Sequence, residues 1–359
     1  MEKISKGYFL PSSAYNLSKR QIKGYIQSED KPQIGDVIFG VIDKIGQHSS
    51  LENKEGRIHN IQKGSRAIFV FGNRYAPDYY EGFVPECYSE YVDLLARSGV
   101  VGIVRSKSSK VIDPTRVKVL GFVCKEAGVK LNTLDFPLVV PRFRKKKKPR
   151  SKMILVVGTS MNSGKSAAAM ACCWTLKTMG FKVRASKVTG TASLKDILHM
   201  NDAGAYPYAD FSYLGYPSTY MLTEEEMIGI FNKLDLKYAN NKDNFWVVEF
   251  ADGIIQRETA MLLQSEDVKS RIHKLIFCAS DAFGVIGGLD ILHRQFSLVP
   301  HAISGVCSSS PLHVEELSKF TNVPVFNSLS VDAEELIKIL TRPNPKKKRI
   351  EEVSSNLTY

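Results

Sequence analysis

The segment "MILVVGTSMNSGKSAAAMACCWTLKTMGF", residues 153–181, predicts the fold of the second half of the chain. It begins with an apolar run, passes through a loop that ends in Gly164, Lys165 and Ser166, and continues as a long helical segment. A buried strand that delivers such a loop, and a helix that leaves it, form the arrangement that binds phosphate groups. The spacing is one residue longer than the usual G-x-x-x-x-G-K-[ST] pattern, because residues 159–163 separate Gly158 from Gly164.

Each residue type in this loop has a chemical reason to be there. Gly164 lets the backbone approach a phosphate closely, Lys165 reaches the β- and γ-phosphates, and the Ser166 hydroxyl is a ligand for Mg²⁺. We therefore expect ATP and Mg²⁺ as cofactors, although the sequence leaves the choice between adenine and guanine open. The predicted nucleotide-binding residues are Gly158, Thr159, Asn162, Ser163, Gly164, Lys165, Ser166 and Ala167. The alternative, a surface turn with an incidental lysine, is disfavoured by the flanking strand and helix.

From residue 153 onward, apolar strands alternate with helices. The expected strands are 153–157, 182–187, 245–250, 274–280, 302–308 and 323–327, and the expected helices include 165–179, 313–321 and 332–341. The strands are continuous apolar runs without alternation, as in a parallel sheet that helices cover on both faces. The predicted fold class is α/β, a P-loop NTPase with a mostly parallel sheet. Residues 281–294, which contain three glycines, are expected to connect a strand to a helix, or else to form a flexible loop over the nucleotide.

The first half of the chain has a different pattern. Short strands with turn residues between them are expected at 35–46, 56–61, 65–73, 99–106 and 115–124, a spacing that favours a small β-barrel or sandwich. We therefore predict an N-terminal extension (1–33), a β-rich barrel-like domain (34–141), a basic linker (142–152), the P-loop NTPase domain (153–341) and a basic polar tail (342–359). The tyrosine-rich segment 71–91 could form a stacking surface, but aromatic residues in a barrel more often belong to its core.

Composition limits the class of protein. The chain has 359 residues, of which 43% are hydrophobic, so it can bury the cores of two domains. It contains no apolar run long enough for a membrane span and no signal-peptide core, so we expect a cytoplasmic protein without a membrane partner. Its six cysteines contain no C-x-x-C pair and are expected to be reduced and mostly buried. The formal charge of +12 is concentrated in part at 142–152 and 344–349, which are either solvated connectors or contacts for a nucleic acid or protein partner.

The loop "GTSMNSGKS" has the spacing of the G-T-D-T-x-V-G-K-T loop of dethiobiotin synthetase, and the resemblance continues along the chain. "ASKVTGTAS" resembles that family's lysine-containing segment and places Lys187 at the matching position. "VVEFADG" resembles its V-E-G-A-G-G segment and places Glu249 on the family's acidic residue. The resemblance covers roughly residues 152–330 and implies an uncharacterised branch of these P-loop proteins, with an added N-terminal β domain. We also expect a homo-oligomer, a dimer.

Departures from the family pattern limit what can be carried over. Ser160 replaces the loop aspartate, Phe250 and Asp252 replace two glycines, and "GVCSSSP" lacks the asparagine that helps to read adenine, so dethiobiotin formation is not expected. By the resemblance, Asp202 and the loop 215–220 lie where the family places substrate or magnesium contacts. The candidate metal ligands are Ser166, Glu249 and Asp202, with Asp252 as a second, weaker carboxylate, and the candidate catalytic residues are Lys165, Lys187 and Glu249.

Two functions remain open. The first is an ATP-dependent, ligase-like enzyme in which Lys187 supplies positive charge beside the phosphoryl group or an anionic small-molecule substrate, and Glu249 at a strand end holds Mg²⁺. The second is a nucleotide-driven switch or ATPase subunit that controls a partner protein or a nucleic-acid complex, a role to which the basic runs and the added domain are suited. A lysine or a carboxylate at a strand end can also simply face solvent.

Overall fold

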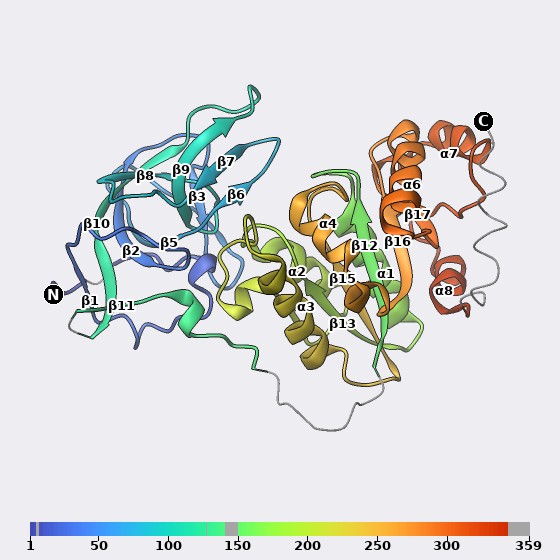
Figure 1. The fold of residues 1–359 in the computed structure, drawn as a ribbon, viewed down its shortest axis with the longest axis horizontal. Coiled ribbons are helices and arrows are strands. Elements are labelled where there is room, and N and C mark those ends of the chain that lie inside the picture. The colour runs from blue at the N-terminus through green and yellow to red at the C-terminus, as the bar shows by residue number, and fades with distance from the viewer. Residues whose placement is uncertain (5–6, 127, 141–149, 344–359) are drawn as a thin grey trace. The chain divides into compact units, whose positions relative to one another are not determined.

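The computed structural model describes residues 1–4, 7–126, 128–140 and 150–343, and its fold is drawn in Figure 1. The chain divides into two compact units. The first unit consists of Met1–Lys145, Lys187–Leu198 and Ala209–Lys237, and the second consists of Lys146–Ser186, His199–Tyr208 and Tyr238–Tyr359. Most of the predicted basic linker, 142–152, and of the predicted tail, 342–359, lies outside the described residues.

The first unit is built on a mixed nine-stranded sheet. Its strand order is β1-β10-β2-β5-β9-β7-β6, with β11 paired to β10 and β8 paired to both β10 and β9. The pairings among β10, β2, β5, β9 and β8 therefore form a closed ring, which removes free strand edges as a small barrel does. The strands are β1 Gly24–Ile26, β2 Val37–Lys44, β5 Arg66–Phe71, β6 Arg74–Tyr75, β7 Tyr80–Phe83, β8 Tyr91–Leu94, β9 Val100–Lys107, β10 Thr115–Glu126 and β11 Val129–Lys130.

Alternating residues of the barrel strands pack into two separate cores. On β5, Phe69 and Phe71 belong to one apolar cluster, whereas Ile68 and Val70 belong to another. Because successive side chains of a strand point to opposite faces, both faces of β5 are buried. The apolar run at 65–73 is therefore continuous and not alternating. The separate hairpin of β3 (Ser50–Glu52) and β4 (Ile58–Asn60) contributes Leu51 to the first cluster.

The six-stranded sheet is mostly parallel, which confirms the predicted α/β class with a separate β-rich part. Its order is β14-β13-β15-β12-β16-β17, and the pairings of β12 with β15, β12 with β16, and β16 with β17 are parallel. The strands are β12 Lys152–Gly158, β13 Lys182–Lys187, β14 Tyr208–Asp210, β15 Asn244–Glu249, β16 Ile272–Cys278 and β17 Ala302–Ser304. All six residues of β15 are buried, as expected for an internal strand covered on both faces.

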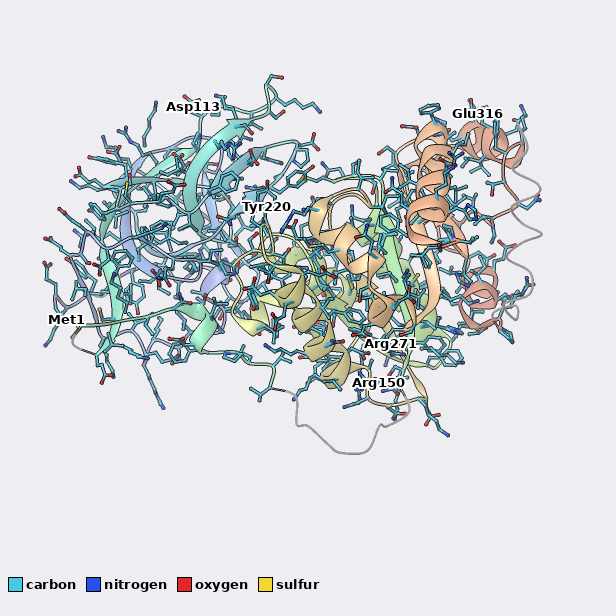
Figure 2. The ribbon with its side chains drawn as sticks, in the orientation of Figure 1. Met1, Asp113, Arg150, Tyr220, Arg271 and Glu316 are labelled. Carbon is cyan, nitrogen blue, oxygen red and sulfur yellow. The ribbon has the colours of Figure 1, made fainter. Side chains whose placement is uncertain are left out.

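Eight α-helices lie in the described residues. They are α1 Lys165–Thr178, α2 Leu194–Asp202, α3 Glu224–Tyr238, α4 Arg257–Gln264, α5 Glu266–Lys269, α6 Ala282–Phe296, α7 Pro311–Ser318 and α8 Ala333–Thr341. Helix α1 packs against α8, β12 and β15. At the amino end of the sheet, Arg271 donates a hydrogen bond to the carbonyl of Ser151 (2.9 Å), and Figure 2 labels Arg271 and the neighbouring Arg150 at this end.

Several predicted elements differ from the structure. Residues 282–294 belong to helix α6, whose N-cap Asp281 accepts a hydrogen bond from the N–H of Gly284 (2.7 Å). The predicted strand at 302–308 stops at Ser304, because Gly305 has a positive φ of 97° and a 3₁₀ helix, Val306–Ser309, follows. The predicted strand at 323–327 is wrong, since only Val325 forms an isolated bridge. The sequence analysis also identified none of the helices α3, α4 and α5.

The cysteines and the tyrosine-rich segment are mostly buried or half-buried. All six cysteines are free, five of them are buried and Cys87 is exposed. In the tyrosine-rich segment, Tyr80 is fully buried, whereas Tyr75, Tyr79, Tyr88 and Tyr91 are half-buried, which favours a packing role. Among the described residues, none of the helices combines the length and the apolar character that crossing a bilayer requires.

Candidate functional site

The loop between β12 and α1 is fixed at its start by two neighbouring segments. The N–H of Thr159 donates to the carbonyl of Cys278 at the end of β16 (2.9 Å), and the carbonyl of Gly158 accepts from the N–H of Ile254 (2.9 Å). A Cβ on Gly158 would lie 2.4 Å from Ser163 Oγ and 2.7 Å from the carbonyl oxygen of Cys278, so the backbone nearby leaves no room for a side chain. The loop therefore starts at the carboxyl ends of β12 and β16 and contacts the segment that follows β15, at the edge where open α/β sheets bind their ligands.

The end of the loop is packed backbone to backbone against the segment after β17. Gly164 has a φ of 93°, and a Cβ there would lie 2.6 Å from the Cα of Gly305. A Cβ on Gly305 would in turn lie 2.2 Å from the carbonyl oxygen of Ser163, and Val306 donates its N–H to the same oxygen (3.2 Å). Two glycines thus allow a close approach that side chains would prevent. Sequence reasoning identified Gly164 and missed Gly305.

The backbone of the loop presents hydrogen-bond donors at the start of α1. The first residues of an α-helix have N–H groups without partners inside the helix, and the helix dipole makes this end favourable for anions. Within the part of the chain that the structure describes, the N–H groups of Ser163 and Gly164 have no protein acceptor. The carbonyl of Gly164 accepts the first helical bond, from Ala168 (3.0 Å). This arrangement can accept several oxygen atoms of one phosphate.

Lys165 is buried beside these donors. The residue is 6% exposed, and its ammonium donates to the carbonyl of Ser160 across the loop (2.6 Å) and, more weakly, to Ser163 Oγ (3.4 Å). Both acceptors are neutral. Because a buried ammonium is stabilised more strongly by an anionic oxygen than by a neutral one, these bonds can be exchanged for bonds to a phosphate.

Ser166 and Glu249 meet beside the lysine. The Ser166 hydroxyl donates to Glu249 Oε1 (3.2 Å), and Glu249, the last residue of β15, is 2% exposed. A hydroxyl and a carboxylate are the hard oxygen ligands that Mg²⁺ prefers, and this ion usually completes its shell with water and substrate phosphates. Groups of three or more His, Cys, Asp and Glu side chains able to hold a metal ion are absent from the described residues. The donor set fits a magnesium ion that also binds phosphate.

Asp202 lies far from this pair. It is exposed at the last position of α2, and the nearby Gly204 approaches the side chain of Lys177 in the last turn of α1. Ser166 is in the first turn of α1, so eleven residues of helix, or about 16 Å, separate Ser166 from Lys177. The position of Asp202 therefore does not support its predicted role as a metal ligand together with Ser166.

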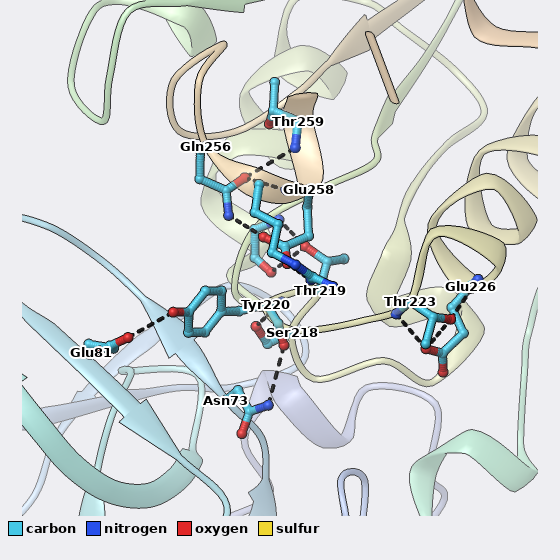
Figure 3. A network of polar contacts seen from close by, with 12 residues as sticks. Asn73, Glu81, Ser218, Thr219, Tyr220, Thr223, Glu226, Gln256, Glu258 and Thr259 are labelled. Atoms are coloured by element: carbon cyan, nitrogen blue, oxygen red, sulfur yellow. Dashed lines mark hydrogen bonds and ion pairs between the residues drawn. The ribbon is translucent and has the colours of Figure 1, made fainter. Parts of the chain in front are cut away.

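The segment after β15 supplies a nearer carboxylate. Asp252 has a φ of 58°, and a Cβ on the following Gly253 would lie 2.2 Å from the carbonyl oxygen of Thr159, so this turn lies against the start of the loop. The side chain of Gln256 accepts from the N–H groups of Glu258 and Thr259 (both 3.1 Å) and caps α4, as Figure 3 shows. The cap fixes the turn that contains Asp252.

Lys187, the other predicted catalytic lysine, belongs to the first unit, whereas Lys165 and Glu249 belong to the second. It ends β13 directly after Ser186, whose hydroxyl accepts a hydrogen bond from Trp246 Nε1 on β15 (3.0 Å). Its side chain is buried and forms an ion pair with Asp196 in the first turn of α2. Sequence reasoning missed Asp196, since an acidic residue in a first helical turn is common for reasons of helix stability.

The predicted substrate loop, residues 215–220, is also part of the first unit. The carbonyl of Gly215 accepts from Thr133 Oγ1 (2.6 Å), and the carbonyl of Tyr220 accepts from Asn73 Nδ2 (3.3 Å). The Tyr220 hydroxyl donates to Glu81 Oε1 on β7 (2.8 Å), a contact drawn in Figure 3. The β-rich part of the chain therefore holds both ends of this loop.

None of the protein-family models matches the chain, and the search of curated proteins gives no match. Among solved structures, the signal recognition particle receptor FtsY from Elizabethkingia anophelis in complex with GDP matches with 13% identity and a TM-score of 0.35, over 59% of this chain and 70% of that chain. A likeness at this level carries no argument about fold or function.

The glycine contact at the loop gives a first prediction. Gly305→Ala should lower the free energy of unfolding by about 1–3 kcal/mol, because the new methyl group overlaps the carbonyl of Ser163 at a positive φ. Gly287→Ala is the matched control, since nothing lies within 4 Å of its Cβ position and alanine favours helix α6. Urea denaturation of both variants checks this. Equal stability of the two would contradict the close approach.

A buried carboxyl group in the first unit gives a second prediction. Asp210 ends β14, is fully buried and accepts a hydrogen bond from the N–H of Ser212 (2.9 Å). Burial raises the pKa of Asp210 from 3.8 to about 6, while the bonds from Ser212 and the charge of Lys187 oppose this rise. The folded protein therefore holds this proton more tightly than the unfolded chain does, and stability falls as pH rises between these two values.

Asp210→Asn should remove that dependence, because the amide does not titrate. The free energy of unfolding of the parent minus that of the variant should fall by about 2–3 kcal/mol between pH 4 and pH 6.5. Urea denaturation at a series of pH values measures this difference. A difference that is flat, or that grows with pH, would show that Asp210 is not held in a raised-pKa environment.

Proposed function

We propose that this chain is a Mg²⁺-dependent P-loop NTPase that binds ATP on the loop 158–167. The observation that carries the proposal is the buried ammonium of Lys165 at the start of a helix, beside the N–H groups of Ser163 and Gly164, for which the described residues provide no acceptor. A lysine, a set of backbone donors and a helix N-terminus together bind phosphate more strongly than any one of them does. The contact of Ser166 with Glu249 supplies oxygen ligands for the ion.

The proposed reaction is phosphoryl transfer from ATP to a carboxylate or carbamate oxygen of an anionic small molecule. The bond between the β–γ bridging oxygen and the γ-phosphorus breaks, the acceptor oxygen bonds to that phosphorus, and ADP leaves. A nucleophile then displaces phosphate from the activated acceptor. In this scheme Lys165 binds the transferred group, Glu249 positions Mg²⁺, and Lys187 offers positive charge to the acceptor. The acceptor chemistry follows from the resemblance to dethiobiotin synthetase. The proposal also includes a homodimer.

A second candidate is a nucleotide-driven switch that acts on a partner protein or nucleic acid. It is favoured by the path of the chain, which leaves the second unit after Ser186 and contributes 187–198 and 209–237 to the β-rich first unit. A change at the end of β13 on nucleotide binding would then act directly on segments that belong to the other unit. The basic run at 142–152 would be a contact for a polyanionic partner.

Lys165→Ala should weaken Mg·ATP binding by about a hundredfold or more, because the lost ammonium is one of the charge-assisted contacts to phosphate. Lys177→Ala, which removes an exposed lysine from the other end of the same helix, is the matched control and should bind like the parent. Calorimetric titration with ATP in the presence of Mg²⁺ measures both. Unchanged affinity in Lys165→Ala would remove the central claim.

Ser166→Ala should instead reduce the dependence of ATP binding on magnesium, because only the hydroxyl ligand is lost.

Glu249→Gln should keep nucleotide binding while lowering phosphate release from ATP, since the amide keeps the shape of the side chain but loses the charge that positions Mg²⁺. Asp243→Asn, an exposed carboxylate just before the same strand, serves as the control. Steady-state phosphate release at saturating ATP is the measurement. If Glu249→Gln turns over like the parent, the carboxylate that matters is another one, and Asp252 is the next residue to replace.

A further inference from the structure

A buried chain of polar contacts in the first unit leads from the β3–β4 hairpin to Lys187. Glu52, the last residue of β3, is 4% exposed. Its Oε1 atom accepts a hydrogen bond from Ser12 Oγ and a second from the N–H of Leu194 (2.9 Å). The backbone of Glu52 is fixed as well, because its N–H donates to the carbonyl of Arg97 (2.8 Å). This carboxylate is therefore held on several sides.

The contact with Leu194 fixes the start of helix α2. Leu194 is the first residue of the helix, and its N–H is one of the groups that a helix leaves without an internal partner. Asp196 follows within the same turn and forms the ion pair with Lys187. Since the residues of one helical turn move together, the position of the Glu52 oxygen determines where the Asp196 carboxylate lies.

The position of Asp196 matters because the Lys187 side chain alone does not fix the position of its ammonium group. Its ammonium is carried on a flexible stem of four carbons, so its place is set by the groups that bind it. Lys187 is 7% exposed and paired with Asp196. The charges of both Lys187 and Glu52 affect the pKa of Asp210, which therefore lies close to them. In phosphoryl transfer a displacement of about 1 Å can cost a hundredfold in rate.

We propose that Glu52, in the β-rich part of the chain, is a positioning residue that sets the place of the Lys187 ammonium through Leu194 and Asp196. The inference rests on the proposed function, because it gives Lys187 a role at the acceptor. The hairpin β3–β4 then orients the side chain of Lys187, which belongs to the same unit. Glu52 itself touches no reactant in this scheme.

Two substitutions distinguish the role of Glu52 Oε1 as a hydrogen-bond acceptor from the role of the negative charge. Both hydrogen bonds go to Oε1, so Glu52→Gln keeps an acceptor for Ser12 and Leu194 and loses only the charge. Glu52→Ala removes both the acceptor oxygen and the charge. Glu55→Ala, an exposed glutamate three residues further in the same hairpin, is the control. Positioning through Oε1 predicts that Gln behaves like the parent and Ala does not.

The first measurement uses no substrate. Acetic anhydride labels lysine side chains, and mass spectrometry reports the rate at Lys187, with the exposed Lys177 as internal reference for an intact fold. Glu52→Ala should label Lys187 about tenfold faster than the parent, the scale of one lost hydrogen bond to a charged group. Glu52→Gln should stay within about twofold, and Glu55→Ala should match the parent. Parent-like labelling in Glu52→Ala, or equal acceleration in Glu52→Gln, would overturn the proposal.

The second measurement separates positioning from general damage. The assay measures phosphate release from Mg·ATP with bicarbonate as the acceptor probe. In the Glu52→Ala variant, kcat should fall to the value of Lys187→Ala, and the KM for ATP should not change. The double variant Glu52→Ala/Lys187→Ala should be no slower than Lys187→Ala alone, because Glu52 acts only through the Lys187 ammonium, which both of these variants lack. Additive losses in the double variant would contradict the proposal. If the parent fails to bind Mg·ATP in calorimetry, the proposed function fails, whereas the labelling experiment still decides whether Glu52 positions Lys187.

Discussion

The arrangement at the loop 158–167 depends on one constraint, the burial of the Lys165 ammonium at the start of a helix. A charged group that is almost removed from water must be surrounded by oxygen atoms, and the loop folds so that the carbonyl of Ser160 and the hydroxyl of Ser163 supply them. That folding requires Gly158 and Gly164 inside the loop and Gly305 beside it, where side chains would collide with the backbone. The same geometry leaves backbone N–H groups available to an anion.

Three strands of the sheet position the loop and the groups around it in the second unit. Strand β12 delivers the loop, β16 binds its first N–H through Cys278, and β15 ends at Glu249 beside Ser166. The next strand in the order, β13, ends at Lys187, from which the chain continues into the first unit. The ion pair of Lys187 with Asp196 lies within that first unit.

The sequence predicted the elements whose pattern is local. The apolar runs at 153–157 and 182–187, and the helix that follows Gly-Lys-Ser, correspond to β12, β13 and α1, because buried strands and a strand–loop–helix order are visible without tertiary information. The class of fold followed from the same runs. Helix α6 was not predicted because its glycines are typical of a loop, yet Gly288 lies against the ring of Phe277, where a Cβ would come within 2.1 Å. Tertiary packing selected glycine there.

Contacts between distant segments could not be predicted. Glu52 and Leu194 are separated by 142 positions, and neither residue lies in a motif. Asp202 was assigned to the metal by resemblance alone, and its place at the last position of α2, near Lys177, follows from tertiary contacts that the sequence does not show. By contrast, Glu249 could be proposed from its place at the end of an apolar strand, since the carboxyl ends of parallel strands share one edge of the sheet.

The central claim, that the loop binds the phosphates of a nucleotide together with Mg²⁺, is tested most directly by amide hydrogen exchange of the full chain with and without Mg·ATP. The account predicts slower exchange in the segment 159–168 when Mg·ATP is present, because the N–H groups at the loop and the start of α1 would then donate to phosphate. Mg²⁺ alone should leave that segment unchanged. If saturating Mg·ATP or Mg·GTP alters no amide in 159–168, the loop does not bind a nucleotide and the account is contradicted.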